Sequence, residues 1–221
     1  MNRENDNFTD AIAALLLVFG GSALVWLLLD RPVTGIDDAD IFLVYARNLA
    51  EGHGLVFNIG GERVEGFTSI LWVLLCSGFF LCFQALEAPL VVLNVLLGAS
   101  GLAACLSRTE RKGLFAVVLA AAPAWFAWCQ ISLMESGLWC MLLTFAVLAV
   151  VDGNRGRLLM LLPLLVLTRP ESMLWGGWLI LLFGFRSGIK TAMVPLGVFA
   201  ISLLALTGFR IAYFGYPLPN T

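Results

Sequence analysis

Long apolar runs separated by short polar breaks make up most of this chain. The first run, residues 11–29, has about 19 residues, enough for a helix to cross a hydrocarbon core of roughly 30 Å. A cleavable signal peptide is the alternative, but the nearby acids and the Asp-Arg-Pro that follows favour a retained helix. The pattern predicts an all-α, polytopic transmembrane helix bundle, with residues 1–221 in a single membrane domain. Further apolar runs occupy residues 69–86, 89–106, 114–133, 137–151, 158–167, 172–185 and 192–207.

One long polar stretch, residues 30–68, interrupts this pattern with seven acids, three arginines and the only histidine, His53. Since hydrocarbon does not tolerate unpaired carboxylates, the stretch is expected outside the bilayer core, held against its surface by the flanking apolar runs. Residues from 37 or 38 to about 51 are predicted to form an amphipathic helix that lies on the membrane and is followed by Gly52. Residues 55–65, around Asn-Ile-Gly-Gly, are predicted to form a small β-hairpin.

Composition agrees with a membrane protein. Hydrophobic residues make up 60% of the chain and charged residues 13%, with a mean hydropathy of +0.93, whereas soluble proteins carry roughly a quarter charged residues. The five cysteines all lie in apolar runs without disulfide or zinc spacing, so they are interpreted as small buried apolar residues. The breaks at residues 107–113, 152–157 and 186–190 hold seven basic residues against two acids. The positive-inside rule assigns these breaks to the cytoplasm.

Counting crossings from a cytoplasmic N-terminus places residues 30–68 on the extracytoplasmic face. For the three basic breaks to be cytoplasmic, either 69–86 or 89–106 must fail to cross. We expect 69–86 not to cross, because it continues from the surface stretch and has Ser77-Gly78 near its middle. The same count predicts that five polar residues at the ends of apolar runs share the outer face: Glu135, Arg169, Glu171, Arg210 and Asn220.

Asp37 and Asp38 are the candidate catalytic residues. Two carboxylates side by side in a partly dry site can hold a proton-accepting oxygen near neutral pH, as a general base or a metal ligand requires. Simple N-capping of a helix explains the same pair equally well. His53 is interpreted as an exposed turn residue, with contact to a head group or substrate as the less favoured alternative. Acids and arginines gathered on one face suit a phosphate or pyrophosphate head group, because arginine presents a planar fork to phosphate oxygens.

The polar stretch resembles the first extracytoplasmic loop of the terminal β-1,2-arabinofuranosyltransferase family. The resemblance is carried by Asp37-Asp38-Ala39, by YARNLAEGHGLVFN at residues 45–58 and by GERVEGFTS at residues 61–69. Residues 168–171 and 209–221 resemble later motifs of that family in the same order. Two positions depart from its pattern: Ile70 replaces a usual proline, and residues 133–137 replace Gly-Leu-Glu-Thr-Pro. Family members continue into further helices and a soluble domain, so the chain resembles their N-terminal half.

The resemblance implies a GT-C-type glycosyltransferase that moves a sugar, such as arabinofuranose or another pentose, from a polyprenyl-phosphate donor to a hydroxyl of a cell-envelope glycan. Asp37 or Asp38 would take the acceptor proton while arginines hold the lipid phosphate. No cofactor, metal or nucleic-acid partner is expected. The expected location is the inner (plasma) membrane, multi-pass, with the active site on the extracytoplasmic face and a further C-terminal domain or partner subunit. The substrate-binding residues implied are Tyr45, Arg47, Asn48, His53, Glu65, Thr68, Glu135, Arg169, Glu171, Arg210 and Asn220.

Two other functions stay open. A transporter or flippase of a lipid-linked or anionic solute predicts ionisable groups near the midplane on broken helices, whereas here the charges lie at the ends of apolar runs. A non-catalytic membrane assembly subunit is the other alternative, favoured by the C-terminal half that this chain lacks relative to the family.

Overall fold

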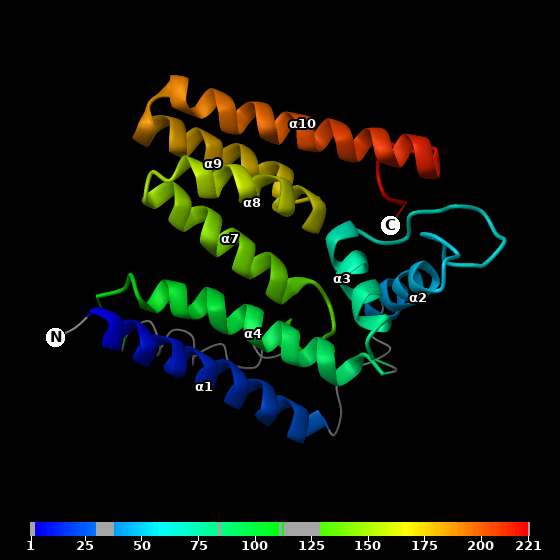
Figure 1. Cartoon of the computed structure of the whole chain (residues 1–221), viewed down its shortest axis with the longest axis horizontal. Coiled ribbons are helices and arrows are strands. Elements are labelled where there is room, and N and C mark those ends of the chain that lie inside the picture. Colours follow the sequence, from blue (N-terminus) through cyan, green and yellow to red (C-terminus); the bar gives the residue numbers. More distant parts are fainter. Residues whose placement is uncertain (1–2, 30–37, 84, 111, 113–128, 221) are drawn as a thin grey trace. The chain divides into compact units, whose positions relative to one another are not determined.

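The computed structural model describes residues 3–29, 38–83, 85–110, 112 and 129–220 (Figure 1). All regular elements in these ranges are α-helices, and no strand occurs among them, which confirms the predicted all-α class for this part of the chain. In chain order the helices are α1 (Arg3–Leu29), α2 (Asp38–Ala50), α3 (Ile70–Phe80), α4 (Glu87–Leu106), α7 (Ser136–Val151), α8 (Arg155–Thr168), α9 (Ser172–Ser187) and α10 (Ile189–Phe214).

The chain folds as two compact units. Unit 1 comprises Met1–Asp40 and Phe83–Thr144, and unit 2 comprises Ile41–Cys82 and Phe145–Thr221. Unit 1 is built around α1 and α4, whereas unit 2 contains α3, α8, α9, α10 and most of the polar stretch.

Three helices in the described ranges are long and apolar enough to cross a membrane: Thr9–Leu28 within α1, Glu87–Leu106 and Ile189–Phe214. A helix of 20 residues reaches about 30 Å, the thickness of a hydrocarbon core. Helix α3 has 11 residues and reaches only about 16 Å. The predicted run 114–133 lies largely outside the described residues.

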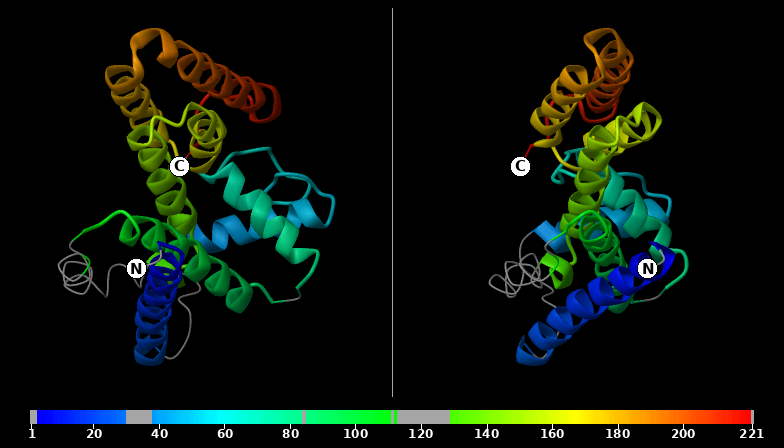
Figure 2. Two further views of the ribbon diagram at one scale, coloured as in Figure 1. Left: turned by 60° about the vertical axis from the view of Figure 1, so that its left-hand side comes forward. Right: turned by 90° about the vertical axis from the view of Figure 1, so that its left-hand side faces the viewer.

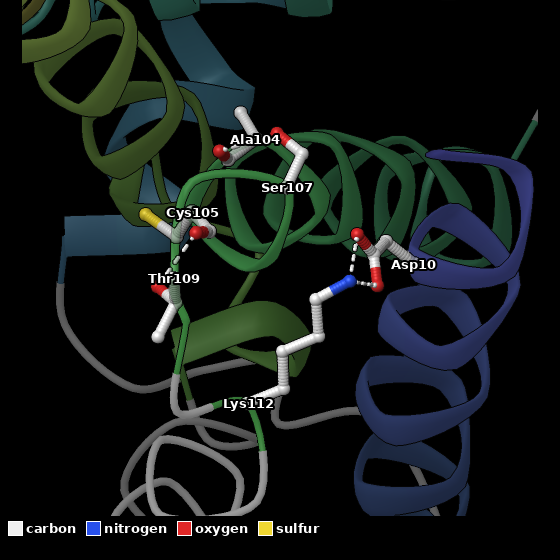
Figure 3. A network of polar contacts seen from close by, with 6 residues as sticks. All are labelled: Asp10, Ala104, Cys105, Ser107, Thr109 and Lys112. Carbon is white, nitrogen blue, oxygen red and sulfur yellow. Dashed lines mark hydrogen bonds and ion pairs between the residues drawn. The ribbon is translucent and has the colours of Figure 1, made fainter. Parts of the chain in front are cut away.

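In unit 1, α1 and α4 pack side by side in opposite directions (Figure 1). Asp10, near the start of α1, accepts hydrogen bonds from Lys112, just beyond the end of α4, with both Nζ–O distances 2.7 Å (Figure 3). If both helices cross the bilayer, the end of α1 and the start of α4 therefore face the same side. The residues between them must then cross an even number of times, an arrangement with which the prediction that 69–86 does not cross is compatible; it stays a prediction.

In unit 2, α8, α9 and α10 pack against one another, and α9 runs back in the direction opposite to α8 and α10 (Figure 2). The turns before α8 and before α10 are therefore at one end of the group, and a Cβ on Gly153 would lie 3.7 Å from Ser187 Oγ. The α8–α9 turn and the end of α10 are at the opposite end, which we call the loop end. The end with the turns before α8 and α10, which we call the basic end, carries Arg155, Arg157, Arg186 and Lys190. The positive-inside pattern predicts such a group of basic residues on one side of a membrane.

Helix α2 begins at Asp38 and ends at Ala50, close to its predicted limits. Gly52, with φ +84°, follows its end, where the Gly52 N–H donates to Leu49 O and the His53 N–H to Asn48 O at 2.8 Å. This is the Schellman arrangement, in which a glycine beyond the last turn satisfies two carbonyls of the helix. The predicted separation of faces is also present, since Phe42 and Tyr45 are buried while Arg47 is exposed.

The β-hairpin predicted for residues 55–65 is wrong. The backbone hydrogen bonds within this segment are local turns, such as Val56 N to Gly54 O and Gly61 N to Asn58 O. Cross-strand pairing is replaced by side chains of α2, since the Asn48 amide donates to the carbonyls of Val56 and Phe57. Buried backbone groups need partners, but a helix side chain satisfies them as well as a second strand does.

Candidate functional site

Tyr45 and Asn48 hold the loop of residues 51–68 onto α2. The Tyr45 hydroxyl donates to Val64 O and accepts from the Gly66 N–H at 3.1 Å. The Asn48 amide nitrogen lies 2.7 Å from Val56 O. Burial raises the pKa of Tyr45. The hydrogen bond from Gly66 opposes this rise, and the charge of Glu65 adds a smaller contribution in the same direction as burial. Both side chains were expected to bind substrate, and in the structure both fix the loop.

A buried ion pair joins the same loop to the end of α10. Arg210 Nε lies 3.0 and 2.9 Å from the two carboxylate oxygens of Glu65, and both side chains are less than a tenth exposed. The Glu65 carbonyl also accepts from the Asn220 N–H at 3.0 Å. Glu65 therefore joins the loop to the last turn of α10, a candidate membrane span, and to the C-terminal segment. Glu65 and Arg210 are 145 residues apart in sequence.

Burial is the largest influence on the Glu65 carboxyl and raises its pKa above the ordinary value, although the charge and hydrogen bonds of Arg210 act in the opposite direction. Removing one partner of such a pair leaves the other charge buried without compensation, which is costly. The pair therefore gives a defined link between loop and helix.

Aromatic rings of α2, the loop and α10 pack together next to the Glu65–Arg210 pair. Phe67 packs edge-on against Tyr45, with ring centroids 4.7 Å apart, and against Phe214 of α10 at 6.2 Å. Tyr213 packs against Phe214 at 4.8 Å, and its hydroxyl accepts from the Leu55 N–H at 3.0 Å. Such edge-to-face pairs add specific geometry to apolar burial. The loop is consequently held by rings as well as by hydrogen bonds.

Arg63 and Arg47 contact aromatic rings. The guanidinium of Arg63 lies 4.7 Å from the centroid of the Tyr213 ring, and that of Arg47 lies 5.4 Å from the Phe80 ring. Both arginines are exposed. A guanidinium over a ring face is attracted by its quadrupole while its donors stay available to a ligand.

Arg169 and Glu171 pair with each other at the α8–α9 turn. The Arg169 Nε and NH2 atoms each lie 3.2 Å from a carboxylate oxygen of Glu171. Partial burial acts to raise the pKa of Glu171, but hydrogen bonds and the charge of Arg169 outweigh it, so the pKa is lowered. The Glu171 side chain is about half exposed, so this pair is open to solvent at the loop end.

An apolar cavity of about 510 Å³ opens in unit 2. Leu49 from α2, Leu55 from the loop and Phe209 from α10 contribute to its wall, and Ser202 is its only hydroxyl-bearing residue. The remaining lining residues are Ile70, Leu74, Pro163, Leu167, Ala205 and Leu206. Such a wall suits a hydrocarbon chain and offers almost no hydrogen bonds.

Glu135 belongs to unit 1, in a break between helical residues 129–131 and α7. Its side chain is fully buried, and the Asn94 amide of α4 donates to the adjacent Met134 carbonyl at 3.0 Å. Leu133 in the same break has φ +59°, a conformation that a leucine adopts only when its surroundings enforce it. The oxygens Asn94 Oδ1 and Gln130 Oε1 are buried without a donor among the described residues.

The remaining predicted residues have simpler positions. Asp37, and the side chain of Asp38, lie outside the described residues. His53 is exposed, with Nε2 3.8 Å from Glu51, as expected for a turn residue. Thr68 is half-buried. No disulfide links the five cysteines of the described ranges, and Cys82 and Cys140 are exposed although small buried side chains were expected. No cluster of three or more His, Cys, Asp or Glu side chains suited to a metal occurs in those ranges.

The structure thus gathers Tyr45, Glu65, Arg210 and Asn220 and puts the Arg169–Glu171 pair at the same end of unit 2. Sequence reasoning missed Tyr213, Arg63 and the amides of Asn94 and Gln130. Tyr213 follows Arg210 by one helical turn, which was a usable signal. An asparagine within the apolar run 89–106 was another, since a buried amide needs partners.

Protein-family models, curated proteins and solved structures were compared with the chain, and none matches it.

Proposed function

We propose that this chain is a membrane glycosyltransferase of the GT-C type, with its site on the extracytoplasmic face of the inner membrane. It transfers a sugar, arabinofuranose or another pentose, from a polyprenyl phosphate to a hydroxyl of a cell-envelope glycan. One observation carries the proposal: an acidic helix, α2, is joined through its loop and the Glu65–Arg210 pair to the end of a candidate membrane span, beside an apolar cavity. This combination suits a lipid-linked substrate that reacts at the membrane surface.

The chemistry asks for a base and for stabilisation of a leaving phosphate. Asp38, at the start of α2, or its neighbour Asp37 takes the proton of the acceptor hydroxyl, which then attacks the anomeric carbon. The bond from that carbon to the phosphate oxygen breaks, and guanidinium groups stabilise the charge that develops on the phosphate. The cavity binds the isoprenoid chain and so fixes one end of the donor, which lowers the entropic cost of positioning the reacting bond.

The test is transfer by membranes that contain this chain, supplied with a panel of radiolabelled polyprenyl-phosphate sugars. We expect Asp37→Asn or Asp38→Asn to reduce transfer roughly 10²- to 10⁴-fold, while loss of a helix cap removes only about 1 kcal/mol of stability. Asp40→Asn is the matched control, because Asp40 is exposed on the same helix. Near wild-type transfer by both single variants would show that the base is misassigned.

Transport is the second candidate, and the break around Glu135 favours it. Asn94 lies about 10 Å along α4 from Glu87 at 1.5 Å per residue, and it contacts the broken segment next to the buried Glu135. Buried polar groups on interrupted helices are typical of transporters. Uptake of a labelled lipid-linked sugar into proteoliposomes, without any change in its glycosidic bond, would favour transport over transfer.

A further inference from the structure

The arginines at the loop end of unit 2 differ in what already neutralises them. Arg210 is paired with Glu65 and Arg169 with Glu171. Among the described residues, no carboxylate lies within ion-pair distance of Arg63 or Arg47, which contact only aromatic rings. Within the described part of the loop end, these two guanidinium groups are therefore the ones whose donors no carboxylate occupies.

Of these two, Arg63 is connected to the apolar cavity through one aromatic ring, that of Tyr213. Its guanidinium covers Tyr213, whose ring stacks on Phe209 with centroids 5.5 Å apart and an interplanar angle of 18°. The Tyr213 hydroxyl accepts from the Leu55 N–H, and both Leu55 and Phe209 line the cavity. Tyr213 thus contacts both the exposed guanidinium of Arg63 and two residues that line the apolar cavity.

We propose that Arg63 binds the phosphate of an isoprenoid phosphate whose chain occupies this cavity, an inference that rests on the proposed function. An apolar cavity whose wall is joined through the Tyr213 ring to a cation on the surface matches an amphiphile with an anionic head. An uncharged lipid leaves Arg63 without an anion, and free phosphate leaves the cavity unfilled. Arg63 was absent from the residues expected from sequence, which named Arg210 instead.

Arg210 is the poorer phosphate ligand for a physical reason. Arg210 is buried and its Nε already donates to both oxygens of Glu65, so a phosphate there competes with a carboxylate that would stay buried if it lost its cation. The Glu65 backbone is also fixed by Asn220, and the adjacent Val64 and Gly66 by Tyr45. Glu65 therefore cannot swing away at low cost, whereas Arg63 is already exposed.

The test measures binding of geranylgeranyl phosphate to the purified protein in detergent micelles, with geranylgeraniol and inorganic phosphate as separate probes. We expect Arg63→Gln to weaken binding of geranylgeranyl phosphate roughly 10- to 100-fold, and Arg63→Lys to weaken it less. The matched control is Arg155→Gln at the basic end, which should bind like the wild type. For the cavity, Ala205→Phe fills the wall and should weaken binding, whereas Ala200→Phe on the same helix should not.

Equal affinity of Arg63→Gln and wild type, in proteins with the same helical circular dichroism, would overturn the proposal. So would inorganic phosphate binding as tightly as the isoprenoid phosphate, since that result removes the role of the cavity. Sugar transfer with an unchanged KM in Arg63→Gln means that the enzyme is correctly proposed and this site is wrong. Arg63-dependent binding without transfer of any sugar means that the site stands and the proposed reaction is wrong.

Discussion

Two polar regions, one in each unit, satisfy their buried groups differently. In unit 2, the Glu65 carboxylate, the Tyr45 hydroxyl and the Asn48 amide all have partners within hydrogen-bond distance. In unit 1, the break at residues 132–135 leaves Asn94 Oδ1 and Gln130 Oε1 without donors among the described residues and includes a leucine at positive φ. The difference separates a region that polar contacts stabilise from one that surrounding packing constrains.

The difference teaches how to interpret a buried polar residue. Where every group is paired, substitution should remove stability, because the remaining partner is left buried alone. Where buried acceptors lack donors and a glycine lies against them, as Gly137 does, stability should instead depend on added side-chain volume. The following predictions test this contrast, from the largest expected effect to the smallest.

The largest effect is expected from breaking the Glu65–Arg210 pair. Glu65→Leu should lower the free energy of unfolding by about 3–5 kcal/mol, because the buried Arg210 guanidinium loses both its counter-charge and its hydrogen-bond acceptors. The double variant Glu65→Leu with Arg210→Met should recover part of this loss, since no charge then stays buried. Reversible unfolding in mixed detergent micelles, followed by circular dichroism, measures all three proteins. A double variant less stable than Glu65→Leu alone would contradict this account.

The next effect concerns Tyr45. Tyr45→Phe keeps the ring contacts with Phe67 but removes the hydroxyl shared by Val64 O and the Gly66 N–H. We expect a loss of about 1–3 kcal/mol, the usual cost of leaving buried backbone groups unpaired. Tyr216→Phe is the matched control, because Tyr216 is exposed and should change little. If the two variants were equally stable, the loop would be held by its rings alone.

A comparable or smaller effect is expected in unit 1 from Gly137→Ala. A Cβ on Gly137 would lie 2.8 Å from Asn94 Oδ1, 3.0 Å from Gln130 Oε1 and 3.1 Å from Asn94 O. Overpacking of this kind costs about 1–3 kcal/mol. Gly20→Ala in α1 meets nothing within 4 Å and should be neutral or slightly stabilising. Thermal unfolding of the pair measures the contrast, and equal midpoints would mean that the break repacks freely.

The smallest effect is a pH dependence. Because burial raises the pKa of Glu65 in the folded protein, the folded state binds that proton more tightly than the unfolded chain. The stability from this group is complete below the ordinary value of 4.5 and is lost as the pH rises through the raised value. The unfolding midpoint of the wild type, relative to the double variant, should therefore fall over this window. A rise in that difference would indicate a lowered pKa.

Most helices could be predicted from the sequence because their apolar runs are long. The run 89–106 became α4 and the run 172–185 became α9, each within a few residues. The exception is 69–86, where α3 ends at Phe80 although the apolar residues continue, and no local breaker explains this end. The hairpin failed for another reason: Asn48 pairs with the loop carbonyls through its side chain, which strand patterns do not reveal.

The candidate site was predicted in composition but only partly in arrangement. Counting the membrane crossings of the apolar runs was enough to predict that Glu65, Arg210 and Asn220 share one end. Which arginine pairs with which acid depends on contacts far apart in sequence, so Arg210 was expected to bind phosphate although Glu65 already neutralises it. Arg63 was overlooked because its partner is the uncharged ring of Tyr213, so no pair of opposite charges in the sequence pointed to this contact.

The distance in sequence between Glu65 and Arg210 also sets an order of events during synthesis. At about 5–20 residues per second, a ribosome takes roughly 7 to 30 s to add the 145 residues that separate them. Throughout this time the acidic loop has been made but Arg210 has not, so only contacts with α2, such as those of Tyr45 and Asn48, can hold the loop. The loop reaches its final form only when α10 emerges, and the nascent chain displays an unneutralised glutamate until then.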